Sequence, residues 1–328
     1  HFYIDSLSSF YSDNRMILDY RLDIPDFFSA FFKMIHLDVD SLLDLFPPFY
    51  SLTGRPAVYQ IEMLRSLILM THFRYVSVKK WVAKLNNDKC LAALCGFNPS
   101  HIPQFSSYYD FFNRFWNEDE KSHLLPSGLN SKPAGVKPKK NQKLVNHSSS
   151  MTRDIVDSYA NSYVSSSPED FLLTIFDKAA INFSIKKSLL DPLSTLSVDG
   201  SAIKTHANPY GSSTNVENYR FYSDIDANFG WDSDLNVYYY GYSAYSISAN
   251  IPKFNIDLPV FLTLARASQH DAITSLTALA KFKSINSTLY PKYYCLDSAS
   301  DNYPTHEFAY SLGMIPLIDI NKRNTGNN

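Results

Sequence analysis

The sequence is poor in cysteine, in long apolar runs and in net charge, and each shortage excludes a class of protein. Three cysteines among 328 residues give no disulfide framework, and Cys90 and Cys95 lack the second ligand pair that a zinc site would need. No apolar run reaches the roughly 18 residues of a membrane span. The formal net charge of −2 excludes a wholly basic nucleic-acid binder, so only local charge can support such binding. We expect a cytoplasmic protein without a membrane partner.

Several common functional signatures are also missing. The chain contains no G-x-S-x-G elbow, no P-loop and no G-x-G-x-x-G fingerprint. The stretch from Asp224 to Gly230 has the form of the start of a calcium loop. However, Phe229 stands where that loop needs glycine, and Leu235 stands where it needs a bidentate glutamate. We therefore reject a calcium loop at this position.

The hydrophobic pattern changes along the chain and predicts two folded parts. Residues 1–125 show apolar residues at helical spacing, with Ser77 and Asp88 as N-caps and Gly96 as a C-terminal stop, which predicts a small helical domain. Residues 126–165 are rich in Pro, Ser and Lys and predict a basic linker. Residues 166–328 show strands in succession, then alternating strands and helices. The expected fold class is α+β or α/β, with a mixed sheet flanked by helices after the helical domain.

Local basic charge occurs on the helical part, in the linker and in the second part. Such residues either form a solvated surface and tether or contact DNA phosphates, and the sequence leaves both interpretations open. The candidate DNA contacts are Lys79, Lys80, Lys84, Arg114, Lys137, Lys139, Lys140, Lys204 and Arg220.

Two aspartates stand at the ends of short β-prone runs. Asp199 follows Leu196 to Val198, and Asp297 follows Tyr293 to Leu296, so each is expected at the end of a buried strand. Carboxylates at adjacent strand ends bind Mg²⁺, which prefers oxygen ligands. Two such ions stabilise both the attacking and the leaving oxygen of a phosphodiester. The competing interpretation is structural, with each aspartate capping a strand–loop junction.

Two other acidic positions are weaker candidates. Asp271 follows His270 and is expected to cap a helix rather than to bind a metal. Asp301 lies in a loop shortly after Asp297 and is a weaker metal ligand candidate. Asp199 and Asp297 therefore remain the predicted catalytic and metal-binding pair.

Several stretches in this order resemble the DDE transposases of prokaryotic insertion sequences. The N-terminal helical region is similar to the N-terminal domain of that family, and the segments around the two aspartates are similar to those that carry its first two catalytic aspartates. The stretches that carry the resemblance are Gly54 to Phe115, Val198 to Ser201, Asp224 to Ser233, Tyr240 to Tyr242, Ala267 to Asp271, Leu296 to Ala299 and Gly313 to Asn321.

The resemblance implies an RNase H-like fold and a two-metal mechanism, in which Asp199 and Asp297 hold Mg²⁺, or Mn²⁺ in its place. It implies that water attacks the phosphodiester at the transposon end, and that the freed 3′-hydroxyl then attacks target DNA. The implied partner is double-stranded DNA, both transposon ends and target, bound by a homodimer. Such a protein would be nucleoid-associated when bound to DNA.

The sequence departs from the family pattern in one respect. The family carries a third acid, a glutamate, on a helix well beyond the second aspartate. The glutamate that follows Asp297 here is Glu307, which is expected on the next helix, too early in the fold. We therefore expect a C-terminally truncated transposase that is inactive, or nearly so, as it stands. The alternatives are a catalytically dead DNA-binding remnant of a transposase and another RNase H-like nuclease.

Overall fold

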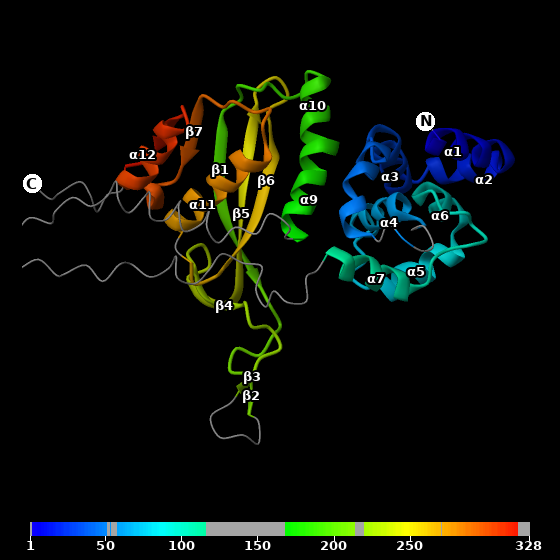
Figure 1. Cartoon of the computed structure of the whole chain (residues 1–328), viewed down its shortest axis with the longest axis horizontal. Helices are drawn as coiled ribbons and strands as arrows, with labels where there is room; N and C mark the ends of the chain where they lie inside the picture. The colour runs from blue at the N-terminus through cyan, green and yellow to red at the C-terminus, as the bar shows by residue number, and fades with distance from the viewer. Residues whose placement is uncertain are drawn as a thin grey trace, which may run out of the picture. The chain divides into compact units, whose positions relative to one another are not determined.

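The structure is a computed structural model that describes residues 2–50, 53, 58–115, 168–213, 220–269 and 271–320. The chain divides into two compact units (Figure 1). The helical unit comprises His1–Asp119 with Lys178–Ala180, and the sheet unit comprises Glu120–Asp177 with Ile181–Asn328. No helix in the described ranges has both the length and the apolar character needed to cross a membrane.

The helical unit is built from short helices. Its α-helices are α1 (Phe2–Asp13), α2 (Arg15–Leu22), α3 (Pro25–His36), α4 (Gln60–His72), α5 (Val78–Asn87), α6 (Lys89–Cys95) and α7 (Phe105–Phe115), with 3₁₀ turns at Asp40–Leu45 and Pro47–Phe49.

The predicted caps of α5 and α6 are confirmed. The Ser77 hydroxyl accepts a hydrogen bond from the Lys80 amide at 3.4 Å, and the Asp88 carboxylate accepts one from the Leu91 amide at 3.2 Å. Gly96 ends α6 with a φ of +91°, a left-handed conformation that favours glycine. These caps satisfy amide and carbonyl groups that a helix end would otherwise leave without partners.

The sheet unit begins with helices and continues into strands. Its elements are α9 (Pro168–Phe176), a π-helical turn (Asp177–Ile181), α10 (Asn182–Lys186), β1 (Leu196–Lys204), β2 (Ser212–Ser213), β3 (Arg220–Phe221), β4 (Asn228–Asp232), β5 (Val237–Ile251), β6 (Ile256–Arg266), α11 (Asp271–Ile285), β7 (Tyr293–Leu296), a 3₁₀ turn (Ser298–Ser300), α12 (Tyr303–Ser311) and β8 (Ile315–Ile318).

The main sheet is mixed. Strand β5 pairs antiparallel with β1 on one side, and with β4 and then β6 along its other side. On the far side of β1, β7 and β8 follow as parallel strands, with α11 and α12 preceding them in the chain. The structure thus agrees with the predicted fold class, in which helices are followed by a mixed sheet.

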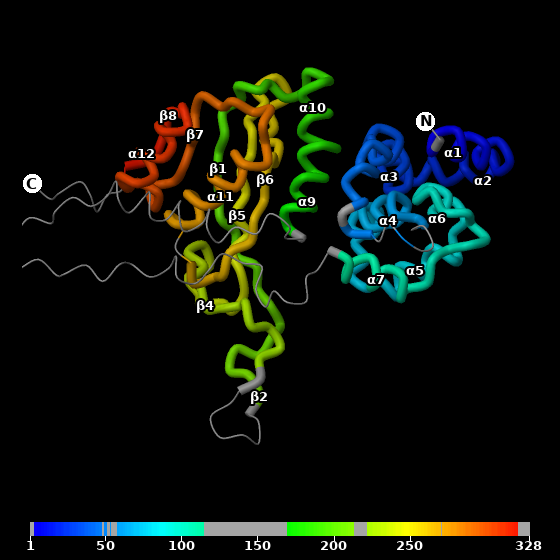
Figure 2. The backbone as a smooth tube through the Cα atoms, in the orientation of Figure 1, coloured from blue at the N-terminus to red at the C-terminus, as the bar shows by residue number. Residues whose placement is uncertain are grey.

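The core of the sheet unit lies between the sheet and α11. Leu276, Leu279 and Phe282 of α11 are buried with Ile247 of β5 and Tyr294 of β7 in one apolar cluster. Figure 2 shows α9 and α10 running beside β6. This packing fixes the positions of β1 and β7, the two strands that carry the predicted aspartates.

Strand β1 does not end at Asp199, contrary to the prediction. Its antiparallel pairing with β5 continues from Leu196 to Lys204, opposite Gly241. Its parallel pairing with β7, in contrast, covers only Leu196 and Ser197. Asp199 therefore lies within β1 but just beyond the point where β1 and β7 separate.

Candidate functional site

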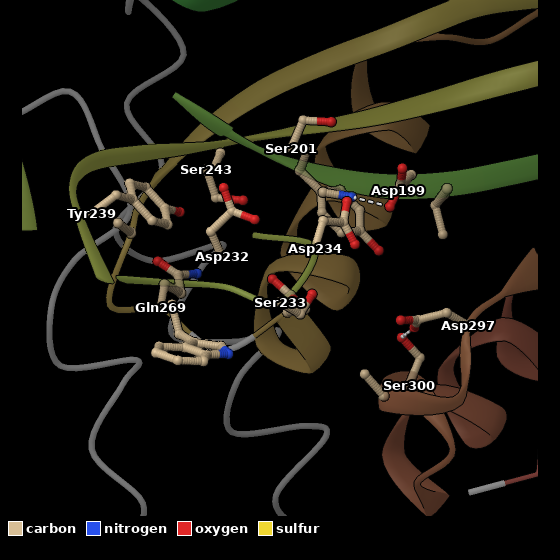
Figure 3. Close-up of a pocket in the computed structure, with 18 residues that line it drawn as sticks. Asp199, Ser201, Asp232, Ser233, Asp234, Tyr239, Ser243, Gln269, Asp297 and Ser300 are labelled. Carbon is tan, nitrogen blue, oxygen red and sulfur yellow. Dashed lines mark hydrogen bonds between the residues drawn. The ribbon is translucent and has the colours of Figure 1, made fainter. Parts of the chain in front are cut away.

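The two predicted aspartates come from neighbouring strands and border one cleft. Leu196 of β1 is paired with Tyr294 of β7, and each aspartate stands three residues after its member of that pair. Asp199 and Asp297 both line a cleft with a volume of about 510 Å³ (Figure 3). The sheet thus brings together two carboxylates that lie far apart in the sequence.

The cleft is strongly acidic. Its walls come from β1, from β4 and the turn into β5, from β5 itself, from the segment between β6 and α11, and from the turn after β7. The carboxylates that line it belong to Asp199, Asp232, Asp234, Asp271 and Asp297. Lys204 lies 3.8 Å from the Asp232 carboxylate and is half-exposed. This excess of negative charge favours a divalent cation and disfavours an unaccompanied phosphate.

Asp199 and Asp297 keep most of their oxygen lone pairs available. The Asp199 carboxylate accepts a hydrogen bond from the Gly200 amide at 2.8 Å, and the Asp297 carboxylate accepts one from the Ser300 hydroxyl at 3.4 Å. Both residues are exposed, and no lysine or arginine of the described part forms an ion pair with either. Such carboxylates can bind a cation without first breaking an internal contact.

The buried phenol of Tyr245 belongs to the lining of the cleft, whereas Tyr294 does not line it. Burial raises the pKa of Tyr245 well above its usual value, and the nearby Tyr294, Asp271 and Asp297 raise it further. Burial likewise raises the pKa of Tyr294. The phenol of Tyr245 therefore stays neutral and adds no charge to the cleft.

Asp271 has a different place from the one predicted. Helix α11 begins at Asp271, so this residue lies in the first turn rather than at the cap position, and His270 lies outside the described residues. Its Oδ1 is 3.6 Å from the position that a Cβ on Gly200 would occupy. Asp271 therefore faces β1 across the cleft. Sequence reasoning also missed Asp232, Asp234 and Gln269, although the stretches from Asp224 to Ser233 and from Ala267 to Asp271 adjoin or contain them.

Three other acidic residues considered from the sequence have structural partners. The Asp224 carboxylate accepts hydrogen bonds from the Asp226 and Ala227 amides and from the Tyr242 hydroxyl. Asp226 pairs with Arg266 at 2.9 Å. Asp301 lies 3.5 Å from His306, and Glu307 does not line the acidic cleft.

The donor set of the cleft fits a hard cation held by few protein ligands. Mg²⁺ is often bound through one or two carboxylates, with water and substrate phosphates completing its shell. Asp199 and Asp297 provide such a pair. Among the described residues, no group of three or more His, Cys, Asp or Glu side chains is arranged to hold a metal ion.

Burial raises the pKa of Cys95 to about 12, so its thiol stays protonated in the helical core.

The candidate DNA contacts are distributed over both units. Lys79 and Lys80 are exposed in the first turn of α5. Lys84 pairs with Asp88 at 3.2 Å, and the Arg114 guanidinium lies 4.6 Å from the centre of the Tyr50 ring. Lys137, Lys139 and Lys140 lie outside the described residues, as does the side chain of Arg220. Lys80 is therefore the most available of the described candidates, since the Lys79 ammonium lies 5.9 Å from the centre of the Phe105 ring.

Comparison with known protein families gives a match over the helical unit. The family model of a transposase domain (DUF772) matches residues 17–114, from α2 to α7. The matched stretch begins well before Gly54, where we placed the start of the resemblance, so the sequence analysis missed its first part. No curated protein and no solved structure matches the chain. The match supports a transposase.

Proposed function

We propose that this chain is a transposase of the DDE type with an RNase H-like catalytic unit. The topology of the sheet supports this proposal. Three antiparallel strands (β1, β5 and β6) are followed by two parallel strands (β7 and β8) on the other side of β1, each preceded by a helix. The resemblance to DDE transposases implies a sheet of this kind.

The single observation that carries the proposal is the placement of Asp199 and Asp297. Each stands three residues after its member of the Leu196–Tyr294 pair of two adjacent parallel strands, and both border the same cleft and have few internal partners. The two carboxylates would hold Mg²⁺, or Mn²⁺ in its place. When bound, these ions would stabilise negative charge on the attacking and the leaving oxygen of a phosphodiester.

The residues of the cleft have distinct parts in this reaction. Asp199 and Asp297 would hold the cations, which when bound would supply positive charge that orients the scissile phosphate of the transposon end. The oxygen of water forms a bond to phosphorus, and the bond from phosphorus to the 3′-oxygen breaks, leaving a 3′-hydroxyl and a 5′-phosphate. The oxygen of this 3′-hydroxyl then forms a bond to a phosphorus atom of target DNA, the bond from that phosphorus to its own 3′-oxygen breaks, and the target strand leaves with a 3′-hydroxyl that takes up the proton. The neutral phenol of Tyr245 adds no further negative charge to the cleft.

DNA binding is assigned to the basic surface at the start of α5. Lys79 and Lys80 contact phosphates of double-stranded DNA in this proposal, and the protein acts as a homodimer that is nucleoid-associated when bound. Replacing both lysines by alanine should weaken binding and reduce the salt slope of log K by roughly 2. The affinity for a duplex, measured over a range of salt concentrations, tests this assignment; an unchanged slope contradicts it.

The catalytic assignment is tested by metal binding and DNA cleavage together. Mn²⁺ is titrated into the chain and into its Asp199→Asn and Asp297→Asn variants, with Asp257→Asn as the matched control. Asp257 lies in β6, does not line the acidic cleft, and has Asn250 as a hydrogen-bond partner. We expect Mn²⁺ affinity to fall at least about tenfold in the two cleft variants only. Equal Mn²⁺ binding by all four proteins would rule out the metal site.

Cleavage of DNA then separates an enzyme from a remnant. Mn²⁺-dependent cleavage that both cleft substitutions abolish supports the transposase. Binding of Mn²⁺ and DNA without cleavage, under conditions in which a control nuclease is active, favours the catalytically dead remnant instead.

A further inference from the structure

The two predicted metal ligands differ in how the chain holds them. Asp199 lies within β1, which is still paired with β5 at this position, and its carboxylate accepts a hydrogen bond from the Gly200 amide of the same strand. Asp297 lies one residue beyond the end of β7, where strand pairing no longer fixes the backbone. A contact outside the sheet must therefore set the direction of the Asp297 side chain.

A buried serine supplies this contact. Ser300 lies in the 3₁₀ turn after β7 and is only 2% exposed. Its hydroxyl has one hydrogen-bond acceptor in the described part of the chain, the Oδ1 of Asp297 at 3.4 Å (Figure 3). Because buried hydroxyl groups are almost always hydrogen-bonded, this hydroxyl is committed to the carboxylate.

We propose that Ser300 is a positioning residue of the metal site, whose hydroxyl holds Asp297 in the orientation that binds a divalent cation. The inference rests on the proposed function and adds to it a residue that acts through Asp297. Ser300 also lines the acidic cleft, which places its hydroxyl on the side of Asp297 that a cation would approach.

The position of Ser300 is itself fixed by helix α12. The Ser300 carbonyl oxygen accepts hydrogen bonds from the Asn302 amide at 2.8 Å and from the Asn302 side chain at 3.0 Å. Asn302 in turn caps α12, since its Oδ1 accepts a hydrogen bond from the Thr305 amide at 3.0 Å. Phe308 and Ala309 of α12 are buried in the core of the sheet unit. The hydroxyl is thus held by a packed helix, as a preorganised site requires.

The effect on cation binding follows from the freedom of the carboxylate. A carboxylate that can rotate must lose that freedom when a cation binds, and the Ser300 hydroxyl removes part of it beforehand. Removal of such an outer partner typically lowers metal affinity roughly 10–100-fold. The bond from Ser300 to Asp297 is long for a hydroxyl donor, and such bonds tighten when the ligand is in place. We therefore expect an effect near the lower end of this range.

The competing interpretation is that Ser300 only closes the turn after β7. However, the Ser300 amide donates to the Asp297 carbonyl oxygen at 3.1 Å, so the backbone closes this turn without the hydroxyl. Loss of the hydroxyl should therefore keep the turn and the thermal stability of the chain, and change cation binding.

The test measures the Mn²⁺ affinity of the 328-residue chain and of its Ser300→Ala and Ser300→Thr variants. Ser300→Ala should lower the affinity by about tenfold, and Ser300→Thr, which keeps a hydroxyl, should recover most of it. Ser311→Ala is the matched control, because the Ser311 hydroxyl of α12 donates to the Phe308 carbonyl oxygen at 2.7 Å and Ser311 does not line the cleft. Thermal unfolding of each variant shows whether the fold is kept.

A double-mutant cycle with Asp297→Asn decides whether Ser300 acts through Asp297. Added to Asp297→Asn, Ser300→Ala should cause no further loss of Mn²⁺ affinity. An unchanged affinity in Ser300→Ala, a full further loss on the Asp297→Asn background, or an equal loss in Ser311→Ala would overturn the inference. If Asp297→Asn alone leaves the affinity unchanged, the metal assignment of the proposed function fails too. If Asp297→Asn lowers the affinity and Ser300→Ala does not, only the role of Ser300 fails.

Discussion

The sheet unit contains two pairs of aspartates that look alike in sequence and differ in what surrounds them. Asp224 and Asp226 have their carboxylates engaged by backbone amides, by Tyr242 and by Arg266. Asp199 and Asp297 each accept one hydrogen bond from a near neighbour and face the cleft. Residue type is the same in both pairs, so availability of the oxygen atoms is what distinguishes a structural carboxylate from a candidate ligand.

The difference arises from the position of each pair on the sheet. Asp224 and Asp226 precede β4, in a turn whose amides point inward at the Asp224 carboxylate. Asp199 lies where β1 has parted from β7, and Asp297 lies where β7 ends. Backbone groups there have other strands as partners or face solvent. Where the two parallel strands separate, the Asp199 carboxylate accepts from a single amide, that of Gly200, and the Asp297 carboxylate accepts from the Ser300 hydroxyl.

The largest expected effect comes from removing a carboxylate charge from the pair Asp199 and Asp297, here called the open pair because their oxygen atoms have few partners. Asp199→Asn should abolish the metal-dependent DNA cleavage that the chain retains, because catalytic groups that act as a unit fail together. Its thermal stability should stay the same or rise slightly, since one negative charge leaves a repulsive cleft. Cleavage rates and thermal unfolding of the same preparation measure both effects. A large loss of stability would instead place Asp199 with the structural pair.

The pair Asp224 and Asp226, here called the engaged pair, should show the opposite behaviour: substitution should lower stability and leave Mn²⁺ affinity unchanged. Asp224→Ala removes the acceptor for two amides and for Tyr242, and should lower the free energy of unfolding by about 1–3 kcal/mol. Mn²⁺ affinity should not change. Urea unfolding and a Mn²⁺ titration test the two parts. If Mn²⁺ affinity fell as far as in Asp199→Asn, the distinction between the pairs would be wrong.

A third substitution attempts to convert the engaged pair into an open one. Arg266→Ala takes the cation from Asp226 and should cost about 1 kcal/mol of unfolding free energy, since the ion pair is only partly buried. No new Mn²⁺ site should appear, because the amides still engage Asp224. Lys253→Ala, in the turn between β5 and β6, is a control for loss of one positive charge. Appearance of a second Mn²⁺ site would mean that ion pairing alone separates the two pairs.

Sequence reasoning identified the elements better than the site. The caps at Ser77, Asp88 and Gly96 were predictable because they depend on a few adjacent residues. The apolar runs before Asp199 and Asp297 indicated strands that the sheet contains. The extension of β1 to Lys204 was not predictable, because it depends on pairing with β5, which is distant in sequence. For the same reason, Asp271 and Gln269 could not be assigned to the cleft: their place depends on how α11 packs against the sheet.

The smallest expected effect concerns pH. Burial and the hydrogen bond to Asp224 raise the pKa of Tyr242 above its usual value of 10.0. The neutral phenol is therefore favoured in the folded state, and its contribution to stability is present below pH 10 and is lost as the pH rises further.

Tyr242→Phe should remove part of this pH dependence. The free energy of unfolding of the variant should fall less steeply above pH 10, and it should be lower than that of the unsubstituted chain at neutral pH. Tyr210→Phe, at an exposed phenol, is the matched control. Urea unfolding at several pH values measures the slope, and identical slopes for Tyr242→Phe and the unsubstituted chain would show that this phenol does not depend on the engaged carboxylate.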